Sequence, residues 1–442
     1  MSVIDLGELR DDVEPDPPAR PPRSVGRPLR VALAGALALL ALAGSVPAAP
    51  TLSALVPWGV GGDFVVLGGR VYVAAPENLG GGGTREMTAY APPTRAGGDL
   101  RPLWRAALPF GAGEIQGQEH GGLVLFTGDH SNGGPETVAV EAASGRQRWR
   151  LSGSATRTAG GGLLLFGFSR GEGGQQPIPL RVVDLASGRL RWSAPLGPDR
   201  TALHYRGVEI DRVALVGGSG RIEVRDAGSG EVLATREPSA GGLREYQGVQ
   251  IVADLLLVIT GDPSGRRRVT AYGLGGLDRR WELDLAPSQE LSYCADLLCA
   301  GSPEAGLSML DPATGRPGSA IPRLQWVVTS RGGRLLVVVG TDQGEADAPA
   351  GMPFAVLDAA TGRTVAELGR WDLADDWDPD GPLLGTRRTR EGGLLVAELD
   401  PVRAVTRHLG VLHDTAGDCH SDGWDLVCRR PSGAYGWWRL GG

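Results

Sequence analysis

The chain has 442 residues, of which 41% are hydrophobic and 21% are charged, and its formal net charge is −7. Its length and apolar content suffice for a large folded domain, and its acidic balance argues against general nucleic-acid binding, which needs a basic face. All 44 basic residues are arginine, so chemistry that depends on a Schiff-base or P-loop lysine is excluded. The 70 glycines follow no collagen period and indicate many tight turns.

The sequence of the first 49 residues predicts a tail followed by a membrane anchor. Residues 1–30 are polar and rich in proline, so we expect a disordered tail. Residues 31–49 carry no charge, and 19 residues are just long enough to span a bilayer as a transmembrane helix. Arginines cluster before this segment, which predicts a cytoplasmic N-terminus and an extracytoplasmic remainder in a single-pass protein of the plasma membrane. These arginines are Arg20, Arg23, Arg27 and Arg30.

A cleaved signal peptide is the alternative interpretation of this segment. Its strongly apolar part covers only residues 31–44, and Val46-Pro47-Ala48 resembles a small-residue cleavage site. The long, acid-containing stretch before it favours an uncleaved anchor. In the alternative the protein is secreted, so both interpretations place the bulk of the chain outside the cytoplasm.

A repeat of about 43 residues dominates the rest of the sequence. Five segments share an acidic residue followed by small residues and a glycine, and they begin at Glu141, Asp184, Asp226, Asp311 and Asp358. Their glycines are 43, 42, 85 and 47 residues apart, so the 85 covers two units. Four tryptophans at nearly the same spacing indicate the repeat length independently. A large aromatic at a repeating position packs between neighbouring sheets. They are Trp104, Trp149, Trp192 and Trp281.

Short apolar runs of four or five residues precede each acidic turn and read as buried strands. A unit of four short strands ending in tryptophan is typical of a propeller blade, and blades must stack in a ring to bury their apolar faces. We therefore predict an all-β domain over residues 51–442, folded as a β-propeller. Residues 51–58 are expected to complete the last sheet and close the ring.

The unit Asp-x-x-[Ser/Thr]-Gly-x-x-x-Trp resembles the PQQ-repeat propellers over residues 59–440. That family includes quinoprotein dehydrogenases and the β-propeller lipoprotein of the outer-membrane assembly machine. The resemblance implies eight blades, the commoner number in the family, whereas a strict count of the repeats gives nine. A quinoprotein would also need adjacent cysteines, calcium ligands around the quinone and a catalytic aspartate. This chain has no adjacent cysteines. We therefore expect neither bound PQQ nor an enzyme.

The four cysteines form two close pairs in the sequence, Cys294 with Cys299 and Cys419 with Cys428. The pairs are separated by about three repeat lengths, so both should occupy one register in two blades, on neighbouring strands of a hairpin. Neighbouring strands bring Cα atoms within disulfide range, and close pairs suit an oxidising compartment. We predict two disulfides; four inert buried thiols are the alternative.

One local motif suggests a cation. Asp376, Asp378 and Asp380 alternate before Gly381 and match the first half of a calcium loop. The bidentate glutamate of such loops is missing, because Arg387 stands at its position, so a solvated acidic loop is the alternative. The six histidines stand at no metal-ligand spacing and are expected in solvated or hydrogen-bonded loops. They are His120, His130, His204, His408, His413 and His420.

Three functions remain open at this stage. The first is a membrane-anchored scaffold that binds a protein or another cell-envelope ligand. The second is a PQQ-dependent oxidoreductase, and the third is a surface sensor that signals through the tail. The missing catalytic residues favour the scaffold, and propellers bind through loops that vary without disturbing the fold.

Overall fold

The computed structural model of the chain describes the strands and most turns of residues 52–441. The described ranges are 52–56, 62–76, 83–92, 100–111, 113–130, 133–171, 174–195, 200–217, 219–237, 245–262, 265–285, 290–294, 297–302, 306–321, 324–340, 351–374 and 381–441. Residues 49–442 form one compact unit. Across the ranges above, no helix has the length and apolar character needed to cross a bilayer. The predicted tail (1–30) and anchor (31–49) lie outside the described residues.

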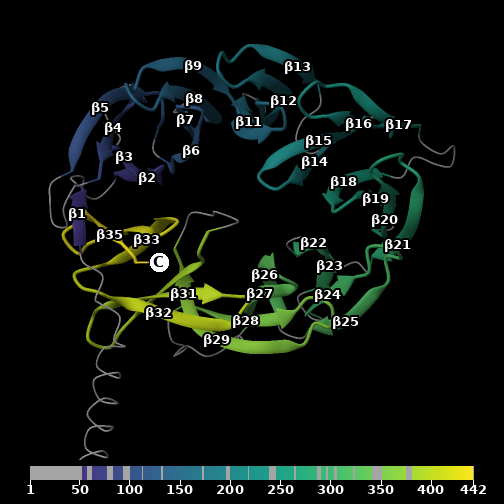
Figure 1. Cartoon of the computed structure of the whole chain (residues 1–442). Helices are drawn as coiled ribbons and strands as arrows, with labels where there is room; N and C mark the ends of the chain where they lie inside the picture. The colour runs from purple at the N-terminus through teal and green to yellow at the C-terminus, as the bar shows by residue number, and fades with distance from the viewer. Residues whose placement is uncertain are drawn as a thin grey trace, which may run out of the picture. The chain divides into compact units, whose positions relative to one another are not determined.

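The described strands divide into four-stranded antiparallel blades that follow one another in chain order (Figure 1). Blade 1 contains β2 (Asp63–Leu67), β3 (Arg70–Ala74), β4 (Arg85–Ala91) and β5 (Arg101–Leu108). Blade 2 contains β6 (Gln116–His120), β7 (Leu123–Asp129), β8 (Pro135–Glu141) and β9 (Gln147–Ser152). Blade 3 contains β10 (Ser154–Thr158), β11 (Gly162–Gly171), β12 (Gly174–Asp184) and β13 (Leu190–Ala194). Blade 4 contains β14 (Thr201–Arg206), β15 (Glu209–Val216), β16 (Ile222–Asp226) and β17 (Val232–Arg236).

The remaining blades continue the same order. Blade 5 contains β18 (Glu245–Val252), β19 (Leu255–Gly261), β20 (Arg267–Gly273) and β21 (Arg279–Leu285). Blade 6 contains β22 (Glu290–Cys294), β23 (Leu297–Ser302), β24 (Gly306–Leu310) and β25 (Pro317–Ile321). Blade 7 contains β26 (Leu324–Arg331), β27 (Arg334–Val339), β28 (Met352–Asp358) and β29 (Thr364–Leu373). Blade 8 contains β30 (Leu384–Arg388), β31 (Leu394–Asp400) and β32 (Val405–Leu412), and blade 9 contains β33 (Gly417–Asp422), β34 (Asp425–Arg429), β35 (Tyr435–Arg439) and β1 (Leu52–Val56).

Two pairs of blades share a sheet. Blades 3 and 4 are joined by a parallel pairing of Thr158 with Ile210. Blades 7 and 8 share β29, whose last residues, Asp372 and Leu373, pair with β30 and serve as the first strand of blade 8. In blades 1, 2, 4, 5, 6 and 7 the first strand lies on the inside of the ring and the last on the outside (Figure 1).

The ring has nine blades among the described residues. A buried hydrophobic cluster lies between every two successive blades, including between blades 9 and 1. The predicted propeller is therefore confirmed, and the preferred count of eight is corrected to nine. The last segment, 417–439, forms a blade of its own because the N-terminal strand supplies its fourth strand. The pairing of Leu52 with Trp438 and of Val56 with Tyr435 closes the ring as expected.

The repeated tryptophans hold neighbouring blades together. Trp149, at the outer strand of blade 2, donates its indole N–H to the carbonyl of Leu185 in blade 3 (2.9 Å). Its ring lies against Gly188, which has a φ of +67°, and a Cβ at Gly188 would lie 2.7 Å from Cγ of Trp149. Only glycine fits this contact without strain. Trp104, Trp192 and Trp281 make the equivalent indole hydrogen bond to the next blade.

Arginine replaces this tryptophan between blades 4 and 5. Ala234 occupies the tryptophan position of blade 4, and Leu277, with a φ of 56°, replaces the turn glycine of blade 5. Arg236 donates to the carbonyl of Leu277 (2.7 Å), and its guanidinium lies 4.9 Å from the ring centre of Tyr272. The side chain differs, but the bond between blades is kept.

The acidic residue of each repeat organises the turn that follows it. Asp184 accepts hydrogen bonds from the backbone N–H and the hydroxyl of Ser187 and from Arg191. The hydrogen bond from Arg191, and then those from Ser187, lower the pKa of Asp184 to about 2. Arg146 and Ser144 likewise lower the pKa of Glu141 to about 2. In two later repeats the turn hydroxyl is the main cause that lowers the pKa of the acidic residue, Asp311 and Asp358.

The lowered pKa values of the turn carboxyl groups predict a gradual loss of folding stability in acid. A carboxyl group whose pKa is lower in the folded state contributes stability above its unfolded pKa, near 4, and this contribution is lost as the pH falls towards about 2. The melting temperature should therefore fall between about pH 5 and pH 2 as the turn carboxylates take up protons on unfolding. Asp184→Asn should melt lower at pH 7 and lose less over this range. An unchanged pH dependence in this variant would argue against the turn carboxylates as its source.

Candidate functional site

The predicted disulfides are present in the structure. Cys294 and Cys299 connect the first two strands of blade 6, and Cys419 and Cys428 connect the first two strands of blade 9. The two blades are three apart, as the spacing predicted. The predicted common register is wrong, because Cys419 and Cys428 are direct partners across the hairpin, whereas Cys294 pairs with Leu297 beside the turn. All four cysteines are buried.

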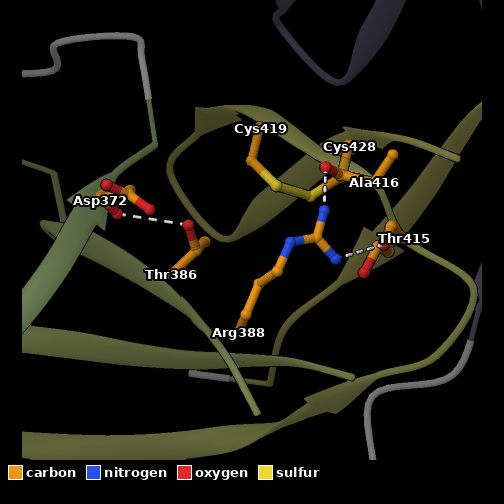
Figure 2. Close-up of a disulfide and its surroundings, with 7 residues drawn as sticks. All are labelled: Asp372, Thr386, Arg388, Thr415, Ala416, Cys419 and Cys428. Atoms are coloured by element: carbon orange, nitrogen blue, oxygen red, sulfur yellow. Dashed lines mark hydrogen bonds between the residues drawn. A yellow bond between two sulfur atoms is a disulfide. The ribbon is translucent and has the colours of Figure 1, made fainter. Parts of the chain in front are cut away.

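Around Cys419–Cys428, an arginine connects blades 8 and 9 (Figure 2). Arg388, at the end of β30, donates hydrogen bonds to the carbonyls of Thr415 and Ala416, which lead into β33. These contacts satisfy backbone carbonyls and give the arginine a structural role.

The predicted calcium ligands Asp376, Asp378 and Asp380 lie outside the described residues. Within the described ranges, no three His, Cys, Asp or Glu side chains are grouped closely enough to hold a metal ion. The repeated tryptophans are occupied by contacts between blades.

In each of several blades, the turn after the third strand lies beside the turn between the first two strands. We call the face of the ring that carries these turns the turn face. In most blades an amide just after the third strand bonds a carbonyl in the turn between the first two strands. Ala142 N–H donates to Gly122 O, and Leu274 N–H donates to Asp254 O. These bonds place the two turns of a blade side by side.

Blade 4 departs from this pattern on the turn face. Its first two strands continue to the turn Gly207-Val208, and the carbonyl that meets the amide of Ala227 belongs to Asp211, three residues beyond that turn. We call residues 204–211 the blade 4 hairpin. The hairpin reaches blade 3, because Ile210 pairs with Thr158 and its carbonyl accepts the N–H of Ala159 (2.8 Å). Ile210 is fully buried, so the hairpin is fixed on its neighbour.

Charged groups brace the hairpin from both sides. Asp211 accepts a hydrogen bond from Nδ1 of His204 and pairs with Nη2 of Arg206 at 3.2 Å. Glu209 accepts a hydrogen bond from Arg157 of blade 3. His204 and Asp211 are mostly buried. Paired charges and backbone pairing together make the hairpin a stiff projection.

The pKa of His120 reports on the same region. Burial, and then the nearby charge of Arg157, lower the pKa of His120 to about 4, while Glu209 opposes this shift. His120 is therefore neutral at pH 7 and adds no charge to the network. A separate ion pair lies between blades 1 and 2, where Arg70 is 3.6 Å from Glu119.

The tip of the blade 4 hairpin is exposed although its base is buried. Tyr205 is 51% and Val208 50% exposed, and the side chain of Arg206 is also exposed. Exposed aromatic and arginine side chains on a rigid support are the residue types that dominate the energy of protein interfaces. The arrangement is therefore suited to binding another macromolecule.

Sequence reasoning missed this hairpin. His120 and His204 were expected in solvated or hydrogen-bonded loops, but His120 ends the inner strand β6 and His204 lies within the inner strand β14, both beside charged groups. A signal was present in the sequence: several blades have a Gly-Gly turn at this point, whereas blade 4 has Gly207-Val208 followed by Glu209 and Asp211. The replacement of the second glycine by Val208, with charged residues on both sides of the turn, could have marked the blade.

The ring of four-stranded blades, with Asp-to-Gly turns and tryptophan contacts between blades, defines a β-propeller of the PQQ-repeat type. A family model described as outer membrane protein assembly factor BamB matches residues 51–283, more than half of the chain, and the chain therefore belongs to this family. The matched region ends within the last strand of blade 5. No curated protein matches the chain.

Several solved structures are similar to the chain at low sequence identity. BamB from Moraxella catarrhalis is 13% identical, with a TM-score of 0.38, and the match covers 86% of this chain and 97% of that one. The C-terminal WD40 domain of Sif2 is 9% identical, with a TM-score of 0.46 and coverage of 90% and 100%. A europium-containing methanol dehydrogenase is 12% identical, with a TM-score of 0.37 and coverage of 88% and 85%.

Proposed function

We propose that the protein is a protein-binding scaffold, anchored in the plasma membrane with its propeller outside the cytoplasm, and that the blade 4 hairpin is its main contact. The observation that carries the proposal is the exposed tip formed by Tyr205, Arg206 and Val208 on a buried base. A support that is rigid before binding loses little entropy on association. The family description, an assembly factor, is consistent with a role in binding other proteins.

The location rests on two independent features. The uncharged segment 31–49 follows a cluster of arginines, and the two buried disulfides suit an oxidising compartment. Protease added to intact cells, with their outer layers made permeable, should digest the region after residue 60. Full protection of that region would contradict the orientation.

In this proposal the propeller performs no catalytic step and holds no quinone. The sequence lacks the adjacent cysteines that the quinoprotein enzymes of this family would use. Folding is then supported by the contacts between blades, such as those of Trp149 and Arg236.

A photo-crosslinking experiment tests the binding site. A photoreactive phenylalanine derivative is placed at Tyr205 in the full chain expressed in its host. The matched control is Phe168, an exposed aromatic residue on the second strand of blade 3. We expect one discrete protein adduct from position 205 and none of the same mass from position 168.

Val208 provides the second arm of this test. Val208→Ser removes an exposed apolar side chain at the tip and leaves the charged residues of the hairpin in place, so it should weaken the adduct at position 205 while the melting temperature changes little. Identical adducts at both positions, or no adduct at position 205, would refute the hairpin as the contact.

A further inference from the structure

We propose that the outer rim of blades 8 and 9 rests on the headgroup layer of the lipid bilayer. The surface consists of Leu55, Val402, Arg403 and Val405, and we call it the anchor-side rim. The inference rests on the proposed membrane anchor and adds to it the face of the propeller that meets the lipid.

The length of chain between the predicted span and the first strand supports this placement. The span ends at Ala49 and β1 begins at Leu52, so only two residues separate them. Three steps of extended chain reach at most about 11 Å. Because β1 is the outermost strand of blade 9, a chain that leaves the bilayer at residue 49 must bring the outer edge of blade 9 close to the membrane surface.

The outer strand of blade 8 lies next to this edge. Leu52 packs against the buried cluster that contains Leu409 and Leu412 of β32. Arg407, also of β32, stacks on Trp424 of blade 9, with the guanidinium carbon 5.2 Å from the ring centre. A surface that approaches the start of β1 therefore also approaches β32 and the turn before it.

The residues of the anchor-side rim have the chemistry of a lipid interface. Leu55, Val402 and Val405 are exposed aliphatic side chains, and Arg403 between the two valines is highly exposed and lies 3.6 Å from the carboxylate of Asp400. Aliphatic side chains enter the boundary between headgroups and acyl chains, while arginine keeps its charge among the phosphates. Basic residues near the surface also gain from anionic lipids.

The chain contains a matched control for this surface. Val405 is the first residue of β32 and is 48% exposed, and Val232 is the first residue of β17 and is 43% exposed. Blade 4, which carries Val232, is as far from blade 9 as the nine-blade ring allows. Both valines therefore have the same type, strand position and exposure, and only one adjoins the proposed anchor.

The experiment uses the full chain reconstituted in vesicles of phosphatidylcholine and phosphatidylglycerol that contain a lipid with a nitroxide headgroup. Val405→Cys and Val232→Cys are made separately and labelled with a fluorophore under non-reducing conditions, which leave the disulfides intact. Flotation first measures whether the protein is anchored, and fluorescence quenching then measures proximity to the headgroups. We expect flotation of both variants and quenching at position 405 that exceeds quenching at position 232 several-fold.

The two arms separate failure of the anchor from failure of the rim. Protein that does not float with the vesicles overturns both the anchor and the rim contact. Protein that floats but shows equal quenching at both positions overturns the rim contact and leaves the anchor standing. Label at position 405 that is unquenched in vesicles and shielded only when envelope proteins are added assigns the rim to a protein partner and overturns the lipid assignment.

Discussion

Replacing Trp149 by alanine should lower the free energy of unfolding by about 3–5 kcal/mol, the usual cost of removing a buried tryptophan. The indole is buried between blades 2 and 3, and its loss leaves Gly188 facing a void. The change also removes the hydrogen bond to the carbonyl of Leu185 (2.9 Å). Denaturant unfolding of the full chain, followed by tryptophan fluorescence and circular dichroism, measures the difference.

Trp149→Phe separates the two contributions. Phenylalanine keeps most of the aromatic packing and loses the indole N–H, so its cost should be smaller and include about 1–3 kcal/mol for the unpaired carbonyl. Arg236→Ala is a useful companion, because Arg236 supplies the hydrogen bond between blades 4 and 5 where the tryptophan is missing, although it donates to a different turn carbonyl, that of Leu277. Equal stability of wild type and Trp149→Ala would refute the role of the repeated tryptophan in joining the blades.

Removing the Cys419–Cys428 disulfide by a double change to alanine should cost about 2–3 kcal/mol, mainly because the unfolded chain gains freedom. The bridge closes a loop with a sequence separation of 9, and the residues pair directly across β33 and β34. These are the first two strands of the blade that closes the ring with β1. We therefore expect a lower melting temperature and earlier exposure of residues 52–56 to protease.

The reduced wild-type protein is the control for this variant. Both cysteines are buried, so reduction should be slow in native buffer and fast in denaturant. Because a reductant also opens Cys294–Cys299, the reduced wild-type protein should melt close to the reduced double variant and below the unreduced one. A double variant as stable as the wild type, or native protein that reduces at once, would contradict a stabilising role for this bridge.

Local repetition made much of the fold predictable. Residues such as Trp149 and Gly188 recur at fixed spacing because the blades that carry them share the same turn and the same contact with their neighbour. The closing strand 52–56 could be anticipated because a blade with three strands leaves an edge unpaired. The spacing also placed Cys294 and Cys419 on equivalent strands of two blades, but the predicted common register was wrong, because Cys419 lies opposite Cys428 whereas Cys294 lies opposite Leu297.

Two features depended on the tertiary structure. The count of nine became clear only where Asp372 and Leu373 at the end of β29 pair with β30 and so begin blade 8 within a strand of blade 7. The blade 4 hairpin was hidden for another reason. Arg157 and Glu209 are 52 residues apart, and His120 is still farther from Glu209, so only the curvature of the ring brings these inner strand ends together. Repeats determine the blades, whereas the site arises where one blade departs from the repeat and meets its neighbour.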